Sequence, residues 1–255
     1  MHLSKIEMIN NIALINIFEK PIKNSKISYQ MLYGEKFKIL EKKKDWLKII
    51  TKFDNYSGYI KNFKFLEKFT PTHKVYKLKS KIFKRNKNKF IPTKKFLYFA
   101  SKISVNDKSK KYFKFEKNNW ILKRDIKKID HYEENFSKLI KLFLNTKYLW
   151  GGKSAAGIDC SALIQIFFFY NGLYFKRDTK DQIKFLKKNV RKNNFNKKHL
   201  IFWKGHVAYC LNKKYLIHAY GPRKKVLIMN IKKTIMEIQK NSNLKVIGVK
   251  KIDVN

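Results

Sequence analysis

The composition of this 255-residue chain indicates a folded protein with an unusually high positive charge. Hydrophobic residues make up 44% of the sequence, which supports a substantial core and excludes an intrinsically disordered chain. No stretch approaches the roughly 18 consecutive apolar residues that a membrane span needs. The beginning of the chain has no apolar segment followed by a small-residue cleavage site, so we expect no signal peptide and a cytoplasmic location, with the cell envelope as the alternative.

The formal net charge is +42 at pH 7. Such a charge would suit a surface for nucleic acid, anionic lipid or an acidic wall polymer. The lysines, however, are spread over the whole chain, and no helix-turn-helix, zinc-finger or RNA-binding signature accompanies them. We therefore interpret the charge as compositional bias, and expect no specific nucleic-acid partner and only weak polyanion binding that fades with salt.

Residues 1–70 are predicted to form a small β-barrel. Short segments alternate apolar and polar residues, as in Lys36–Ile39 and Trp46–Ile49, and this period of two is typical of half-buried antiparallel strands. The successive segments LYGEKFKIL, DWLKI and YSGYI resemble bacterial SH3-like domains.

Residues 71–128 are predicted to form a second, degenerate SH3-like barrel. Thr70-Pro71-Thr72 is a predicted linker, and the segments after it repeat the strand pattern less clearly. The charged run from Lys81 to Lys89 is predicted to be a solvated loop.

The hydrophobic period changes to that of helices in residues 129–255. Apolar residues at helical spacing follow Asp130, a second helix is expected to begin at Cys160, and a third would be capped by Asp178 or Thr179. Four strands are then predicted at HLIFWK, HVAYCL, KYLIHAY and KVLIMNI, followed by a helix over 234–239 and a strand over 244–250. Helices followed by an antiparallel sheet form an α+β domain.

A nucleophile and two candidate partners occur in this last part of the chain. Cys160 stands at the first turn of an apolar helix, where unpaired N–H groups favour a thiolate and can lower the cysteine pKa. His206 and His218 lie in neighbouring predicted strands and could act as a base and as a group that orients it. Cys210, the second cysteine, is interpreted as a small buried hydrophobic residue, and two cysteines do not make a disulfide framework.

Residues 129–255 resemble the NlpC-type cysteine peptidases, bacterial γ-D-glutamyl-diamino-acid endopeptidases whose catalytic domain is a reduced papain-like fold. Six motifs in family order carry the resemblance. They are Tyr148-Leu149-Trp150-Gly151-Gly152, Gly157-Ile158-Asp159-Cys160-Ser161, Arg177-Asp178-Thr179 with Gln182, Leu200-Ile201-Phe202-Trp203, Gly205-His206-Val207 and Ile217-His218-Ala219.

The resemblance implies a role for each matching residue. Cys160 would be the nucleophile, His206 the base, His218 the group that holds the base, and Tyr148 an oxyanion donor together with the backbone N–H of Cys160. The implied substrate-binding residues are Asp159, Ser161, Asp178 and Thr179, with Glu35 and Tyr56 of the first barrel as candidates for binding the substrate's amine.

Other residues are expected to have structural roles. Ala162 stands where the family usually has glycine, and Lys198-His199 replaces its usual Gly-Asp. We expect His2, His73, His131 and His199 at the surface, and Trp150 and Phe202 in packing. No His-x-x-x-His or Cys-x-x-Cys pair occurs, so no metal or cofactor is expected.

The sequence therefore predicts a papain-like cysteine endopeptidase preceded by two SH3-like barrels. The implied reaction is hydrolysis of the γ-D-glutamyl–diamino acid bond of murein peptides, in peptide recycling, by a monomer. Two alternatives remain open: a secreted cell-wall hydrolase, and an inactive protein that binds wall polymer.

Overall fold

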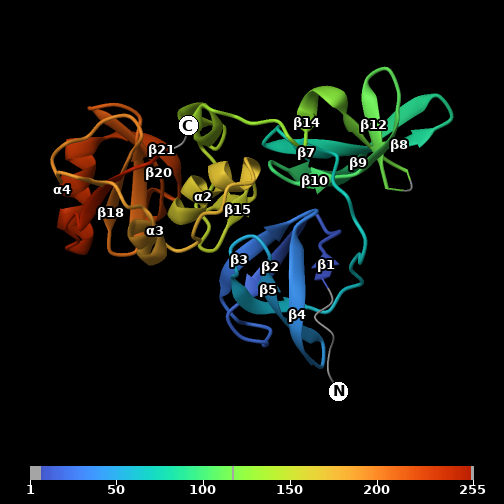
Figure 1. Ribbon diagram of the computed structural model, residues 1–255, viewed down its shortest axis with the longest axis horizontal. Coiled ribbons are helices and arrows are strands. Elements are labelled where there is room, and N and C mark those ends of the chain that lie inside the picture. The colour runs from blue at the N-terminus through green and yellow to red at the C-terminus, as the bar shows by residue number, and fades with distance from the viewer. Residues whose placement is uncertain (1–6, 117, 254–255) are drawn as a thin grey trace. The chain divides into compact units, whose positions relative to one another are not determined.

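The computed structural model describes residues 7–116 and 118–253, and its ribbon is drawn in Figure 1. The chain divides into two compact units. The first contains the described residues up to His131 together with Lys153–Ala155, and the second contains Tyr132–Gly152 and the described residues from Ala156 onwards. No helix in the described ranges is long and apolar enough to cross a membrane. His2 lies outside the described residues.

The first unit begins with a six-stranded antiparallel sheet. Its strands are β1 (Glu7–Ile9), β2 (Leu14–Phe18), β3 (Ile27–Leu32), β4 (Lys36–Lys43), β5 (Trp46–Thr51) and β6 (Ser57–Lys61), in the order β1-β4-β5-β6-β2-β3. The alternating side chains point into one core, in which Ile17, Phe37 and Ile49 are fully buried, as a period of two requires.

A second group of strands completes the first unit. They are β7 (His73–Val75), β8 (Lys79–Asn86), β9 (Lys89–Tyr98), β10 (Lys102–Ile103), β11 (Val105–Lys108), β12 (Tyr112–Phe115), β13 (Asn119–Leu122) and β14 (Ile126–Lys128), with the 3₁₀ turn Lys123–Asp125. They form the sheets β10-β7-β14 and β11-β12-β13-β8-β9. Tyr33 of the first strand group packs into the core of the second.

The segment from Lys81 to Lys89 is not a loop, as the sequence analysis predicted, but most of a β-hairpin. Strand β8 runs to Asn86 and pairs with β9, and the chain turns at Lys87, which has φ 51°. The lysines occupy the solvent side of β8, whereas Ser80 and Ile82 between them are buried. The exposed lysines made this segment resemble a loop in the sequence, although its alternate residues are buried as in a strand.

Gly34 allows the two strand groups to meet. Its φ is +80°, and a Cβ there would lie 2.4 Å from the carbonyl oxygen of Lys102. Both the left-handed backbone and the close approach require glycine. The neighbouring backbone bond, from Lys102 N–H to the carbonyl of Tyr33 at 2.9 Å, completes this junction.

The second unit is a six-stranded antiparallel sheet with helices on both faces. Its elements are α1 (Phe136–Lys141), β16 (Gly157–Ile158), α2 (Cys160–Tyr170), α3 (Thr179–Phe185), β17 (Asn189–Val190), β18 (His199–Trp203), β19 (His206–Cys210), β20 (Tyr215–Tyr220), a 3₁₀ turn (Gly221–Arg223), β21 (Lys225–Asn230), α4 (Ile231–Ser242) and β22 (Gly248–Lys251). The short strand β15 (Lys153–Ser154) belongs to the first unit. The sheet order is β17-β22-β18-β19-β20-β21. Ile231 and Ile238 of α4 pack on one face, and Phe136 of α1 stacks on Tyr209 on the other, at 4.5 Å between ring centroids.

The α+β prediction and the four central strands are confirmed, with two corrections near the end of the chain. Helix α4 is longer than 234–239, because the Asn230 side chain accepts the N–H of Lys233 and so starts the helix earlier. The predicted strand over 244–250 begins only at Gly248. Leu244 and Val246 instead pack against the α4 side of the sheet.

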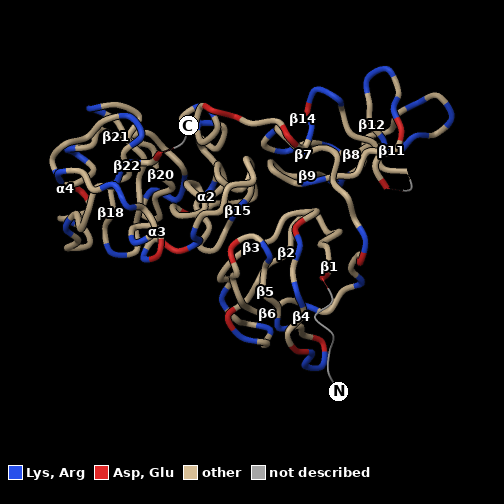
Figure 2. The backbone as a smooth tube through the Cα atoms, in the orientation of Figure 1, with Lys and Arg blue, Asp and Glu red and all other residues tan. Residues whose placement is uncertain are grey.

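The first unit also holds a buried ion pair. The Lys153 ammonium has no exposed surface and lies 2.9 and 3.0 Å from the two carboxylate oxygens of Glu35. It also donates to the Tyr29 hydroxyl at 2.8 Å. Lysine and arginine positions occur along both units, as Figure 2 shows. The pair ties the segment 153–155 into the first unit.

We expect Lys153→Met to lower the free energy of unfolding of the intact protein by about 3–5 kcal/mol, because it leaves the Glu35 carboxylate buried without a cation. The double variant with Glu35→Gln should recover part of this loss. Urea denaturation would measure the free energy of unfolding of each variant. Lys188→Met is the matched control, since Lys188 and Asp253 form an exposed pair worth about 1 kcal/mol or less. If Lys153→Met and Lys188→Met lowered the free energy of unfolding equally, the buried pair would not have the stabilising role assigned to it.

Candidate active site

Helix α2 begins at the predicted nucleophile because Asp159 caps it. The Asp159 side chain accepts the N–H of Ala162 at 2.8 Å, which satisfies one of the unpaired donors of the first turn. Every residue from Cys160 to Tyr170 is buried. The helix therefore holds the thiol rigidly at its N-terminal end.

The Asp159 carboxylate is also bound from outside the helix. Arg177 donates to both of its oxygens, at 3.1 and 2.5 Å, and to the Ser161 hydroxyl at 2.6 Å. The Gly151 N–H donates to Asp159 at 2.9 Å. Asp159 and Ser161 are thus bonded within the protein and only 5% and 6% exposed. Their substrate-binding role stays a prediction.

The turn before α2 depends on two glycines. Gly151 has φ +74°, and a Cβ on Gly152 would lie 2.5 Å from the carbonyl oxygen of Gly157, so neither position accepts a side chain without strain. Trp150, which we expected to be packed, is 62% exposed. Its ring is exposed next to Gly151, whose N–H donates to Asp159.

His206 and His218 form a hydrogen-bonded pair, with His206 Nε2 and His218 Nδ1 2.9 Å apart. The Nδ1 atom of His206 is therefore the nitrogen that can accept a proton. In that state Nε2 of His206 carries a hydrogen and donates it to His218, whose own hydrogen then sits on Nε2, 3.3 Å from the Met229 sulfur. Met229 accordingly completes a chain that fixes both tautomers.

Two aromatic residues that the sequence analysis did not assign surround the base. The rings of Trp203 and Tyr220 lie 5.5 and 5.7 Å from the His206 ring, and Tyr220 stacks on His218 at 4.7 Å. Tyr220 follows His218 by two residues on β20, so the strand period could have placed both on one face. These rings restrict how the imidazoles can turn.

The Cys160 thiol lies at the turn that carries His206. Its Sγ donates to the Gly205 carbonyl at 3.9 Å. Burial raises the pKa of the Cys160 thiol to about 12, aided by the nearby Asp159 carboxylate and opposed by the N–H of Val207. This corrects the expectation of a lowered pKa, because burial outweighs the helix terminus. Cys160 therefore carries a neutral thiol at pH 7.

The pKa values of the neighbouring groups are also set by burial. Burial lowers the pKa of His206 to about 4, and burial together with His206 lowers the pKa of His218. Burial and the nearby Cys160 raise the pKa of Tyr148. At neutral pH the imidazoles are therefore uncharged, and the Tyr148 phenol keeps the proton that an oxyanion donor needs.

The remaining predicted substrate-binding residues belong to α3 and to the first unit. Asp178 and Thr179 stand half-buried at the start of α3, where burial raises the pKa of Asp178. Glu35 is bound by Lys153 within the first unit, so an incoming ammonium would have to displace a buried lysine. Tyr56 packs on Tyr29 at 4.9 Å and donates weakly to the Ser28 carbonyl at 3.4 Å.

His199 is not at the surface, as we expected, but only 7% exposed. Its Nδ1 accepts the Asn196 N–H at 3.1 Å, so it holds the turn before β18. His73 and His131 are half-buried, and Phe202 and Cys210 are fully buried. The described residues contain no group of three or more His, Cys, Asp or Glu that could hold a metal ion.

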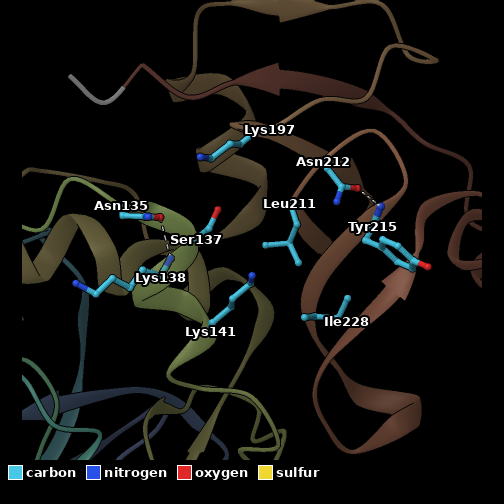
Figure 3. A pocket seen from close by; sticks show the side chains of 9 residues that line it. All are labelled: Asn135, Ser137, Lys138, Lys141, Lys197, Leu211, Asn212, Tyr215 and Ile228. Atoms are coloured by element: carbon cyan, nitrogen blue, oxygen red, sulfur yellow. Dashed lines mark hydrogen bonds between the residues drawn. The ribbon is translucent and has the colours of Figure 1, made fainter.

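A cavity of about 740 Å³ in the second unit lies away from these groups. Figure 3 shows Lys138, Lys141 and Lys197 among its lining side chains. Leu211, which also lines it, follows the end of β19 opposite to His206, roughly 17 Å along the strand. The cavity is therefore separate from the Cys160 site.

Comparison with known proteins gives matches in both units. The NlpC/P60 family model matches residues 145–243, and the bacterial SH3 domain model matches residues 13–62. The chain is 35% identical to dipeptidyl-peptidase 6 of Lysinibacillus sphaericus over 88 residues, which cover 34% of this chain and 32% of that protein. The first relative is thus matched over less than half of its length.

Two further comparisons cover most of the chain. It is 26% identical to gamma-D-glutamyl-L-lysine dipeptidyl-peptidase of Bacillus subtilis (strain 168) over 237 residues, 83% of this chain and 78% of that protein. The crystal structure of an NlpC/P60 family protein from Bacillus cereus ATCC 10987 aligns over 96% of this chain and 99% of that chain, with a TM-score of 0.77 and 16% identity. The overall fold is therefore shared with that structure.

We expect His218→Ala to lower kcat about 10²-fold, because His206 would lose the group that fixes its orientation and tautomer. His218→Gln should retain more activity, since an amide oxygen can accept the His206 Nε2 hydrogen. Steady-state kinetics would test this order, with His73→Ala in the first unit as control. Wild-type kcat in His218→Ala would refute the assigned role.

The free energy of unfolding should fall as the pH decreases from about 6.5 to about 4. His206 has a folded pKa of about 4 against its ordinary value of 6.5, so the unfolded chain binds more protons in this window. Denaturant unfolding at several pH values would show a shallower slope for His206→Gln than for the wild type. Identical slopes would show that His206 titrates normally.

Proposed function

We propose that this chain is a cysteine endopeptidase that hydrolyses the γ-D-glutamyl–diamino acid bond of murein peptides. The match of the NlpC/P60 family model to residues 145–243 supports this proposal. The observation that carries the proposal is the position of the Cys160 thiol beside the turn of His206, together with the bond between His206 and His218. These are the parts that acyl transfer to a thiol requires.

The first half of the reaction transfers an acyl group to Cys160. The thiol proton moves to Nδ1 of His206 as Sγ forms a bond to the carbonyl carbon of the substrate. The Cys160 N–H and the Tyr148 hydroxyl donate to the resulting oxyanion, and one such donor is worth about 3 kcal/mol in the transition state. The carbon–nitrogen bond then breaks as His206 returns the proton to the leaving amine.

The second half releases the product acid. Water gives a proton to His206 and attacks the thioester carbonyl, and the carbon–sulfur bond breaks as the thiol regains its proton. The raised pKa of Cys160 means that proton transfer accompanies the attack instead of preceding it. His218, which Met229 contacts, holds the His206 ring in the required orientation throughout.

The name of the Bacillus subtilis relative, a gamma-D-glutamyl-L-lysine dipeptidyl-peptidase, supports the choice of bond. We further propose that the enzyme acts in peptide recycling. It requires that short free peptides are better substrates than intact wall, whereas a wall hydrolase would prefer the polymer. Comparing digestion of purified sacculi with that of the free tripeptide separates these two functions.

Cys160→Ala should abolish hydrolysis of L-Ala-γ-D-Glu-diaminopimelate, with a loss of at least about 10³-fold, because no other group forms the acyl intermediate. Cys210→Ala is the matched control, since this second buried cysteine should leave kcat within a few-fold of wild type. A peptide with an α-linked glutamyl residue should not be cleaved. Full activity in Cys160→Ala would reject the mechanism.

A further inference from the structure

The cavity of about 740 Å³ in the second unit lies between α1 and the turn that joins β19 to β20 (Figure 3). Its volume is within the range of small-ligand sites, about 300–1,000 Å³. The Ser137 hydroxyl of α1 donates to the Tyr209 hydroxyl of β19 at 3.2 Å, and Phe136 of the same helix stacks on the Tyr209 ring. These two contacts fix the helix against the sheet beside the cavity.

The polar part of the lining consists mainly of hydrogen-bond donors. Among the described residues that line the cavity there are three lysines and no acid. Asn135 uses its Oδ1 to accept the Lys138 N–H, and Asn212 uses its Oδ1 to accept the N–H groups of Lys214 and Tyr215. Each amide therefore keeps its NH₂ group for another partner. A lining of ammonium and amide donors without a carboxylate favours an anionic ligand.

Two of the three lysines are directed into this space. Figure 3 shows Lys141 pointing from α1 toward Leu211, and Lys197 pointing from the segment before β18 toward Ser137, whereas Lys138 points away. Of the ion pairs between described residues, none includes Lys141 or Lys197, whereas the Lys138 ammonium lies 2.9 Å from a carboxylate oxygen of Glu133. A phosphate group between Lys141 and Lys197 would form charge-assisted hydrogen bonds with both.

The opposite side of the cavity is apolar and includes Leu211, Tyr215 and Ile228. In the sheet, Ile217 pairs with both Tyr209 and Ile228, so Ile228 and Tyr215 lie on the face that α1 covers, since side chains alternate along a strand. Tyr215 is 39% and Ile228 40% exposed, so the helix leaves this end of the face open. An exposed aromatic ring beside an aliphatic side chain is a surface on which a flat aromatic group can stack.

We propose that this cavity binds a nucleoside diphosphate. The phosphates pair with Lys141 and Lys197 and accept hydrogen bonds from the asparagine amides, and the base stacks on the Tyr215 ring. An inorganic anion would use only the charged side of the cavity, and an uncharged nucleoside only the apolar side. Because the cavity lies at the end of β19 opposite to His206, this binding is a property separate from the proposed hydrolysis.

The test is titration calorimetry of the full chain with ADP, with pyrophosphate and adenosine as the two partial ligands. We expect ADP to bind at least about tenfold more tightly than either, because only ADP contacts both sides of the cavity. The double substitution Lys141→Gln and Lys197→Gln should raise the Kd for ADP at least about tenfold. Tyr215→Ala should weaken the binding of ADP and leave that of pyrophosphate unchanged. These measurements need no peptide substrate, so their outcome is independent of the proposed hydrolysis.

The matched control is the double substitution Lys192→Gln and Lys245→Gln, because a chain of net charge +42 attracts anions at many places. These are exposed lysines of the second unit outside this cavity, so the same charge is removed and the Kd for ADP should stay unchanged. All the substituted side chains are exposed, so the variants should fold. The proposal is overturned if ADP does not bind, if the two double variants weaken its binding equally, or if pyrophosphate binds as tightly as ADP.

Discussion

The hydrogen bonds of the Asp159 carboxylate are the interactions on which the site in the second unit depends. The carboxylate caps the helix that carries Cys160 and accepts a hydrogen bond from the Gly151 N–H. Its two oxygens also accept hydrogen bonds from the Arg177 guanidinium. Three segments that are separate in the sequence are therefore fixed by one side chain. Because a buried carboxylate is stable only when its oxygens are satisfied, each of these partners is needed to keep the thiol in place.

The sequence was sufficient to predict the helix start at Cys160 and the strands that carry His206 and His218, because these depend on local signals. An aspartate before an apolar run marks a helix start, which located Cys160. The alternation of β19 and β20 located His206 and His218. The exposure of Trp150 could not be predicted, since an irregular turn such as 148–152 has no hydrophobic period from which burial can be read.

Electrostatics was the least predictable property of the site. The helix N-terminus at Cys160 was visible in the sequence, but the depth of burial was not, and burial decides the direction of the pKa change. The same burial keeps His206 uncharged, and the Met229 sulfur, a weak acceptor, lies 3.3 Å from His218 Nε2. Burial therefore favours the neutral forms of Cys160 and His206 over an ion pair of thiolate and imidazolium.

The ion pair of Lys153 and Glu35 has a consequence for how the protein is made. Residues 153–155 belong to the first unit, although the chain has already entered the second unit at Tyr132. A ribosome that has released only the two groups of strands presents Glu35 in a barrel that lacks its cation. The buried pair can form only when the turn before α2 has been synthesised, so the first unit is not contiguous in the sequence.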